Sequence, residues 1–422
     1  MAVHVIDEAN RCLQCKKPMC QQGCPIHTPI PAMIKALKEG GLEEAGAMLF
    51  SNNPMSLVCS LVCNHERQCE GHCVLGRKGQ PVHVSSIENY ISDTCLERID
   101  VRCQPKNGKK VAVIGAGPAG ITIAILLTQK GYSVTIFDSR DKIGGVLQYG
   151  IPEFRLPKSI LDRYKKKLQS IGIRIRPNTT IGGALEIKDL FRDGYESIFI
   201  GTGVWRPKKL GIKGESLGNV HFAIDYLANP DAYDLGDRVA VIGVGNSAMD
   251  VARTVIRKGS HHVTLYARGN HSDASLHETQ YAMLDGAKFE FNRNVVEIND
   301  NGPVFQQILY DEEGNAAGVS DEKEQVYADS VIISISQGPK SKLVNTTEGL
   351  KATRNGLLET DEQGETTVEG IFASGDVVLG AKTVVEAVAY SKTVADAMDA
   401  YMKEKAGKEK NEKDGKGLAG RE

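Results

Sequence analysis

The sequence has 422 residues, and its 51 lysines and arginines nearly balance its 53 aspartates and glutamates, so the net charge is close to zero. This length allows two or three domains, and the balanced charge provides no general attraction for nucleic acid or an anionic membrane. Only 6% of the residues are aromatic and Trp205 is the single tryptophan, which argues against a surface that stacks on carbohydrates or bases.

The start of the chain lacks a basic segment followed by an apolar segment, so we expect no signal peptide and a cytoplasmic protein. The longest apolar stretch, Val111–Leu127, contains three glycines and a proline. It is also slightly too short to cross a bilayer. We interpret it as a strand, a turn and a helix, and we expect no membrane association.

Cysteine placement is the most informative part of the composition. All ten cysteines lie between Cys12 and Cys103. A secreted protein held together by disulfides would not leave its larger part without a bridge. The first 105 residues are therefore predicted to be a helical domain whose cysteines bind metal, with helical apolar spacing at Ala32–Phe50 and Ser85–Arg98.

The cysteine spacing favours iron–sulfur clusters. There are two groups, Cys12-x2-Cys15-x4-Cys20-x3-Cys24-Pro25 and Cys59-x3-Cys63-x5-Cys69-x3-Cys73. Bacterial ferredoxins have a related run ending in Cys-Pro, whose fourth cysteine binds a different cluster from the first three. Cys24 is therefore expected to join the second group. The alternative is zinc held by four thiolates, but zinc sites usually use paired C-x2-C motifs and only Cys12 and Cys15 form one.

From Lys109 the pattern changes to alternating strands and helices. The run Gly115-Ala116-Gly117-Pro118-Ala119-Gly120 follows a predicted strand and opens a helix, and Asp138 closes the next strand. Such glycines allow a tight turn and the close approach of a pyrophosphate, the helix N-terminus binds phosphate, and the acid binds a ribose hydroxyl. This unit is predicted to bind a dinucleotide.

Two further segments indicate that this dinucleotide is FAD. Gly375-Asp376 follows an apolar strand, as in flavoproteins where an Asp meets the ribityl chain and the pyrophosphate. The strand before Gly201 and Gly203 also resembles a glycine-ended strand of such proteins. An isolated Gly-Asp would be an ordinary turn, but beside the first fingerprint it favours FAD.

A second unit of the same kind begins at Gly243-Val244-Gly245-Asn246-Ser247-Ala248, without the third glycine. Its next strand ends at Ala267-Arg268, with no acid to hold a free 2′-hydroxyl. Arg268 is a candidate partner for a 2′-phosphate, which favours NADPH over NADH. The alternative for Arg268 is an ordinary surface arginine.

The predicted fold is α/β, with two Rossmann-like dinucleotide-binding domains, the second inserted in the first, after an α-helical iron–sulfur domain. A last helix is expected at about Val384–Lys403, followed by a charged, apolar-poor tail. The expected limits are residues 1–105 for the helical domain, 106–236 and 329–402 for the two parts of the FAD domain, 237–328 for the NAD(P)H domain, and 403–422 for a disordered tail.

From Cys12 to about Met402 the sequence resembles the small (beta) subunit of NADPH-dependent glutamate synthase. It is similar in the same way to the flavin half of dihydropyrimidine dehydrogenase and to the large subunit of the electron-bifurcating ferredoxin–NADP transhydrogenase. The stretches that carry the resemblance are RCLQCKKPMCQQGCP, CNHERQCEGHC, GAGPAG, GGVLQYGIPEFRLPK, GVGNSAMD and ASGDVVLGAKTVVEAV.

This resemblance implies a division of the cluster ligands. One [4Fe-4S] cluster would use Cys12, Cys15, Cys20 and Cys73, and the other Cys24, Cys63, Cys69 and Glu88. Cys59, Cys95 and Cys103 would then be spare thiols, although spacing alone would make Cys59 a ligand. Within the matching stretches it also implies the cofactor-binding residues Gly144, Gly145, Arg155 and Thr383. The chain departs from relatives that use NADPH and carry two adjacent arginines where Ala267 and Arg268 stand.

The implied function is an NAD(P)H-oxidising flavoprotein that passes electrons singly, through FAD and [4Fe-4S] clusters, to a larger catalytic or electron-accepting subunit, without a catalytic acid or base of its own. One alternative is the electron-delivering subunit of a dihydropyrimidine dehydrogenase-type or bifurcating complex. A disulfide reductase is disfavoured because no cysteine follows Cys103. A redox sensor containing flavin and clusters is the non-enzyme alternative.

Overall fold

A computed structural model describes residues 4–311, 313 and 315–419 of the chain. By its internal contacts the chain divides into two units. The first contains the described residues up to Gly145, then Leu156–Val204 and the chain from Pro339 onward, and the second contains Val146–Arg155 and Trp205–Gly338. The second unit is thus inserted in the first, as predicted. The second unit, as defined by its internal contacts, includes more residues than the predicted NAD(P)H domain at 237–328. The domain limits given above stay predictions.

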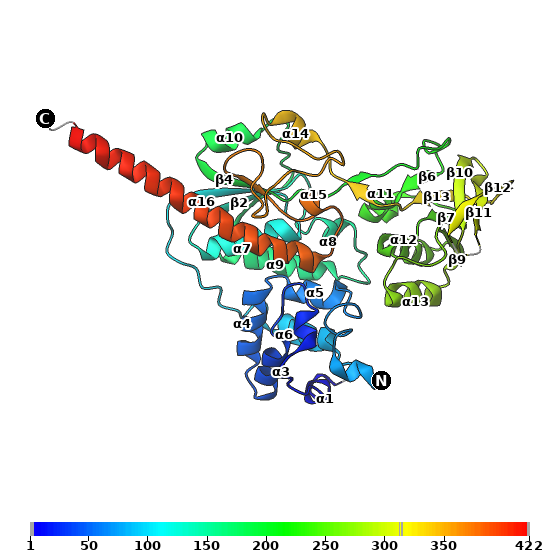
Figure 1. Cartoon of the computed structure of the whole chain (residues 1–422), viewed down its shortest axis with the longest axis horizontal. Coiled ribbons are helices and arrows are strands. Elements are labelled where there is room, and N and C mark those ends of the chain that lie inside the picture. The colour runs from blue at the N-terminus through cyan, green and yellow to red at the C-terminus, as the bar shows by residue number, and fades with distance from the viewer. Residues whose placement is uncertain (1–3, 312, 314, 420–422) are drawn as a thin grey trace. The chain divides into compact units, whose positions relative to one another are not determined.

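The first unit begins with a helical domain (Figure 1). Its helices are α1 (Val5–Asn10), α2 (Met19–Gln22), α3 (Ile30–Lys38), α4 (Leu42–Asn52), α5 (Ser56–Val62), the 3-10 helix η1 (Val74–Arg77) and α6 (Val84–Cys95). The expected helix at Ser85–Arg98 is confirmed as α6. The helical spacing over Ala32–Phe50 is confirmed as two helices, α3 and α4, because Gly40 adopts a positive φ of 83° and ends α3 before α4 begins.

The first unit continues with a five-stranded parallel sheet in the order β15-β4-β1-β2-β3. Helices α7, α9 and α16 lie on one side of this sheet and α10 and α14 on the other (Figure 1). In chain order the elements are β1 (Lys110–Ile114), α7 (Pro118–Gln129), β2 (Ser133–Phe137), α9 (Lys158–Ser170), β3 (Arg174–Arg176), α10 (Ile187–Arg192), β4 (Tyr195–Ile200), α14 (Lys342–Thr346), β15 (Ile371–Ala373), α15 (Asp376–Leu379) and α16 (Val384–Ala419). The predicted buried strands around the first fingerprint are confirmed.

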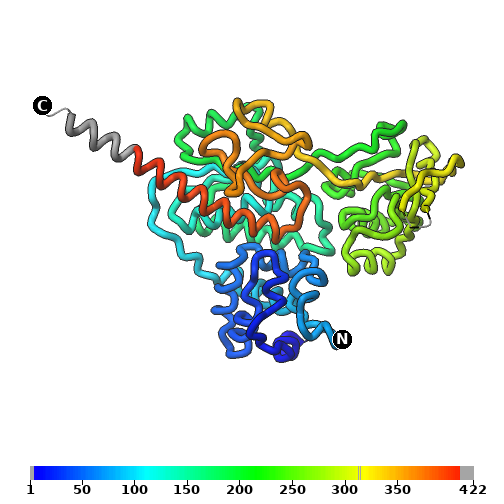
Figure 2. The backbone as a smooth tube through the Cα atoms, in the orientation of Figure 1, coloured from blue at the N-terminus to red at the C-terminus, as the bar shows by residue number. Residues whose placement is uncertain are grey.

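The chain returns to the first unit at its C-terminal end. Figure 2 shows this returning segment, coloured orange and red, beside the segment that carries the first fingerprint. Helix α16 packs along α7, and the Ser391 hydroxyl lies 2.7 Å from that of Ser374, both being buried. The prediction of a disordered tail from Lys403 is contradicted as far as Ala419, because helix α16 continues to that residue. Ion pairs one helical turn apart, Lys403–Asp399 and Lys408–Glu404, support the helix where apolar residues are few.

The second unit is built around another five-stranded parallel sheet, in the order β6-β13-β7-β8-β9. An antiparallel sheet, β10-β11-β12, and a short pair, β5 and β14, accompany it. Its elements are α8 (Val146–Tyr149), β5 (Arg206–Pro207), β6 (Val220–Phe222), α11 (Ala223–Ala228), η2 (Pro230–Ala232), β7 (Arg238–Ile242), α12 (Asn246–Arg257), β8 (His262–Tyr266), α13 (Leu276–Asp285), β9 (Lys288–Glu290), β10 (Arg293–Asn299), β11 (Gly302–Tyr310), β12 (Ala316–Gln325), β13 (Ser330–Ile333) and β14 (Gln337–Gly338). None of the helices in the part of the chain described is long and apolar enough to span a bilayer.

Candidate cofactor sites

The first cysteine group surrounds Cys20 in the helical domain. Cys12 and Cys15 follow α1, Cys20 lies in α2, and Cys73 directly precedes η1. Burial, with smaller effects from the sulfurs of Cys73, Cys12 and Cys15, raises the pKa of the Cys20 thiol to about 11. The four sulfurs line one small pocket that is otherwise mostly apolar. Thiols gathered where anions are poorly solvated fit a site at which bound metal neutralises the thiolates.

The second group gathers around Cys69 and Glu88. Burial, with the charges of Glu88, Glu70 and Cys24, raises the pKa of the Cys69 thiol well above its usual range. A hydrogen bond with Cys59, followed by burial and by Glu88 and Cys69, does the same to Cys63. Burial raises the pKa of the Glu88 carboxyl to about 8. The fold therefore brings Cys24, Cys63, Cys69 and Glu88 together, which is the division that the family resemblance implies.

Two of the three remaining cysteines stand apart from these groups. Cys95 is buried in α6 and donates to the Leu42 carbonyl at 3.4 Å, and Cys103 is exposed. Within residues 4–311, 313 and 315–419, no three His, Cys, Asp or Glu side chains converge on the position of a single metal ion. In a four-iron cluster each cysteine binds a different iron, so the ligands stand farther apart than they do around one ion.

The flavin fingerprint lies at the carboxyl ends of β1 and β4. Gly115 has a φ of +105°, and a methyl group there would stand 2.5 Å from the carbonyl oxygen of Gly201. A methyl group on Gly120 would meet the Gly115 carbonyl oxygen at 1.9 Å. The turn therefore admits only glycine, and it leaves the start of α7 open to a phosphate.

The other predicted flavin segments meet this turn. The N–H of Gly144 donates to the Ala116 carbonyl at 2.7 Å. A methyl group on Gly145 would stand 2.9 Å from the Cα of Gly117, and one on Gly375 would stand 3.0 Å from the Cβ of Ala119. Segments far apart in sequence thus form one cradle, as a dinucleotide site at a sheet edge requires.

The predicted acids of this site hold backbone N–H groups. Asp138 accepts from Ala116 at 2.6 Å and from Arg140 at 2.8 Å, and burial raises its pKa. Asp376 opens α15, and burial raises its pKa to about 6. Thr383 directly precedes α16, and its hydroxyl donates to Glu386 at 2.6 Å, so this side chain caps the helix. Its backbone N–H donates to the same carboxylate at 2.9 Å, and its carbonyl accepts from the Ala387 N–H at 3.1 Å.

The second fingerprint opens α12 in the second unit. Gly243 has a φ of +126°, and Gly245 is extended, with open space where a side chain would point. Asn246 and Ser247 are exposed at the helix start. The Asn246 side chain accepts from the Ser275 N–H at 2.9 Å, so it also fixes the start of α13.

A cleft of about 880 Å³ lies against this fingerprint, wholly within the second unit. Gly243 and Gly245 line it, together with four basic residues, Lys208, Lys209, Arg268 and Arg293. The surplus of positive charge suits a ligand with several phosphates. The sequence pattern predicted a phosphate-binding role for Arg268 but not for the lysine pair, since two adjacent basic residues after Pro207 are its only signal.

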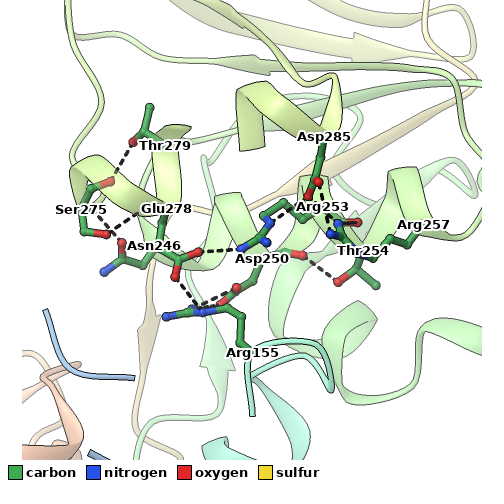
Figure 3. A network of polar contacts seen from close by, with 10 residues as sticks. All are labelled: Arg155, Asn246, Asp250, Arg253, Thr254, Arg257, Ser275, Glu278, Thr279 and Asp285. Carbon is green, nitrogen blue, oxygen red and sulfur yellow. Dashed lines mark hydrogen bonds and ion pairs between the residues drawn. The ribbon is translucent and has the colours of Figure 1, made fainter. Parts of the chain in front are cut away.

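Arg155 is expected to bind cofactor, and in the structure it joins a buried ion network with α12 and α13 (Figure 3). Its guanidinium contacts Asp250 at 2.7 and 3.0 Å and Glu278 at 2.9 Å. Arg253 extends the network to Glu278 and Asp285, each at 2.9 Å. Only 13% of the Arg155 side chain is exposed and 5% of that of Asp250. The cofactor role of Arg155 stays a prediction.

Substituting the two glycines of the second fingerprint should affect different properties, stability for Gly243 and nucleotide binding for Gly245. A methyl group on Gly243 would stand 2.2 Å from the Ser334 carbonyl oxygen at a strained φ, so Gly243→Ala is expected to destabilise the second unit by about 1–3 kcal/mol. Gly245→Ala meets no atom within 4 Å and should fold normally while weakening NADPH binding. Denaturation followed by Trp205 fluorescence, with NADPH titration, separates the two. Equal stability of both variants would contradict this prediction.

Two known families match this chain, one over the cysteine-rich segment and the other over most of the remainder. Residues 109–391 match the pyridine nucleotide-disulphide oxidoreductase family. Residues 2–99 match the family described as dihydropyrimidine dehydrogenase domain II, 4Fe-4S cluster.

Individual proteins are similar over nearly the whole chain. The glutamate synthase [NADPH] small chain of Escherichia coli is 33% identical, over 93% of this chain and 90% of its own. The NAD-dependent dihydropyrimidine dehydrogenase subunit PreT homolog of Salmonella typhi is 31% identical, over 94% of each. The solved structure of Mycobacterium tuberculosis FprA in complex with NADPH has a TM-score of 0.60 at 18% identity, over 72% of this chain and 87% of its own. This last likeness shows the fold.

Proposed function

The chain belongs to the glutamate synthase small-chain family of flavoprotein oxidoreductases with a 4Fe-4S domain, and on that premise we propose that it carries electrons from NADPH, by way of FAD and two [4Fe-4S] clusters, to a larger partner subunit. The observation that carries the proposal is the grouping of the ligands. Cys12, Cys15, Cys20 and Cys73 form one set, and Cys24, Cys63, Cys69 and Glu88 form another. Two separate sets of four support two clusters.

The residues around the flavin fit a site that positions its cofactor. The glycine cradle at Gly115 and Gly120 admits a pyrophosphate, and Asp138 and Asp376 lie at its two ends. Bound FAD would supply the change from two-electron to one-electron chemistry. The side chains proposed here bind and orient, and none is needed as a catalytic acid or base.

The partner is proposed from the name of the relative, since a glutamate synthase small chain implies a larger chain. A second candidate is a subunit of a dihydropyrimidine dehydrogenase, which the similarity to the Salmonella protein favours. Mixing the purified chain with each type of large subunit and following NADPH-dependent formation of glutamate or of dihydropyrimidine distinguishes them. A cytoplasmic location belongs to the same proposal.

Arg268 is proposed to bind the 2′-phosphate of NADPH. It is exposed, lines the basic cleft and comes two residues after the end of β8. Loss of a charged hydrogen bond costs about 1.5–3 kcal/mol, so Arg268→Ala should lower kcat/KM for NADPH roughly 10- to 100-fold and leave that for NADH nearly unchanged. The reaction is followed as reduction of a one-electron dye. Equal losses of kcat/KM with both nucleotides in Arg268→Ala would contradict this role. If the unaltered chain reduced the dye with neither nucleotide, the redox-sensor alternative would be favoured.

A further inference from the structure

The sulfurs of the second cysteine group have neighbours beyond the proposed ligands. The Thr28 hydroxyl lies 3.3 Å from the Cys24 sulfur, and the His65 Nδ1 lies 3.3 Å from the Cys69 sulfur. Cys59 lies one helical turn before Cys63, and its side chain raises the pKa of the Cys63 thiol. Each of the three cysteines proposed to bind the second cluster therefore has one additional polar side chain beside it.

These contacts follow from local backbone geometry. Thr28 comes four residues after Cys24, and Cys59 and His65 each come four residues before their cysteine. The Cys63 N–H donates to the Cys59 carbonyl at 3.0 Å, so this pair is one helical turn apart. The His27 N–H donates to the Cys24 carbonyl at 2.9 Å, which turns the chain back and brings Thr28 to the sulfur. Within a helical turn, as between Cys59 and Cys63, side chains at this spacing face each other.

The direction of each hydrogen bond follows from the chemistry of a cluster ligand. A cysteine bound to iron is a thiolate, which accepts and does not donate. The Thr28 hydroxyl, the Cys59 S–H and the His65 N–H must then be the donors. Thr28 is 3% exposed and Cys59 2%, so water does not compete for these two donors. On the other side of the His65 ring, Nε2–H donates to the Ser60 carbonyl at 3.2 Å, so donation from both ring nitrogens requires the imidazolium form of His65.

We propose that Thr28, Cys59 and His65 tune the second iron–sulfur cluster by donating one hydrogen bond to each of its three cysteine sulfurs. The three are positioning residues and not ligands. A reduced cluster carries one more negative charge than an oxidised one, so donors to its sulfurs stabilise the reduced form and raise the reduction potential. This inference rests on the ligand set given under the proposed function.

The first cysteine group offers an internal comparison. Among the side-chain hydrogen bonds of the described residues, its sulfurs receive one, from the exposed Gln14 amide to Cys12 at 3.5 Å. Substituting Thr28, Cys59 or His65 should therefore change one cluster and leave the other as a control in the same molecule.

The test is a redox titration of the reconstituted full chain, followed by electron paramagnetic resonance at low temperature. Thr28→Val, Cys59→Ala and His65→Leu remove the donors. Each is expected to shift the ratio of reduced to oxidised second cluster about tenfold toward oxidised at a fixed ambient potential, which is ~59 mV for a one-electron couple. The matched variants Thr28→Ser, Cys59→Ser and His65→Gln keep a donor and should stay near wild type.

The outcomes separate this inference from the proposed function. Two loaded clusters with unchanged potentials in the donor-removing variants would overturn the inference alone. Wild-type protein with a single four-iron site would overturn the ligand assignment, and the inference with it. Because three independent positions are tested, failure of one variant to fold leaves the other two decisive.

Discussion

Replacing Cys20 by serine is expected to remove about four of the iron atoms that each chain binds, together with the matching sulfide. Cys20 lies among Cys12, Cys15 and Cys73, and no other cysteine of the first group can take its place. A serine hydroxyl is a poor ligand for iron that prefers thiolate, so the whole cluster should be lost and not one ligand alone. Iron and sulfide analysis after anaerobic reconstitution measures the effect.

The control for this prediction is Cys95→Ser. Cys95 is more deeply buried than Cys20, and its sulfur contacts the Leu42 carbonyl and belongs to neither group. It should keep the full iron content. Unchanged iron in Cys20→Ser, or equal loss in both variants, would contradict the proposed first cluster.

Replacing Arg155 by methionine is expected to destabilise the second unit by about 3–5 kcal/mol. The change leaves the Asp250 carboxylate buried without its main counter-charge (Figure 3). Trp205 belongs to the second unit and is the single tryptophan, so its fluorescence during urea denaturation reports this loss. Adding Asp250→Asn to the variant removes the unpaired charge and should recover much of the stability.

The loss in Arg155→Met should also depend on pH. Burial already raises the pKa of Asp250 to about 6, and Arg155 lowers it, so the variant pKa should be higher still. A raised pKa in the folded state means that the native chain binds a proton which the unfolded chain does not. Stability therefore falls as pH rises toward the folded pKa, and the deficit should shrink at pH 5.

A surface ion pair serves as the control for Arg155. Lys213 pairs with Glu297 at 2.7 Å, but its side chain is 83% exposed, so Lys213→Met should leave the denaturation midpoint nearly unchanged. A midpoint for Arg155→Met equal to that of Lys213→Met would show that the buried network does not stabilise the unit.

Local signals account for much of what the sequence predicted. Each of the apolar strands before Gly115, Gly243 and Gly375 is followed by a glycine that permits a tight turn. All three strands are confirmed, as β1, β7 and β15. Such signals need no knowledge of distant contacts.

Tertiary contacts explain most of what the sequence did not predict. Spacing alone places Cys73 with Cys63 and Cys69, whereas the fold brings it to Cys20, and only the family resemblance anticipated this. Arg155 meets a carboxylate 95 residues away, and no local pattern predicts such a pair. The antiparallel strands β10–β12 were missed because β12 is exposed along almost its whole length and lacks an alternating apolar pattern.

The helical tail shows the limit of composition as a guide. The segment after Lys403 has few apolar residues, which favours disorder when burial is the only criterion. Its alanines, lysines and glutamates are nevertheless strong helix formers, and α16 is already well packed against α7 before this segment begins. A helix already started extends at little cost.

We propose that an NADPH-reduced flavin supplies electrons to two iron–sulfur clusters in one chain. The decisive experiment is anaerobic reconstitution of the full chain, analysis of iron, sulfide and flavin, and titration of the visible spectrum with NADPH and NADH. We expect about eight iron atoms and about one FAD per chain, with bleaching by NADPH. Zinc in place of iron, or a flavin that neither nucleotide reduces, would contradict it.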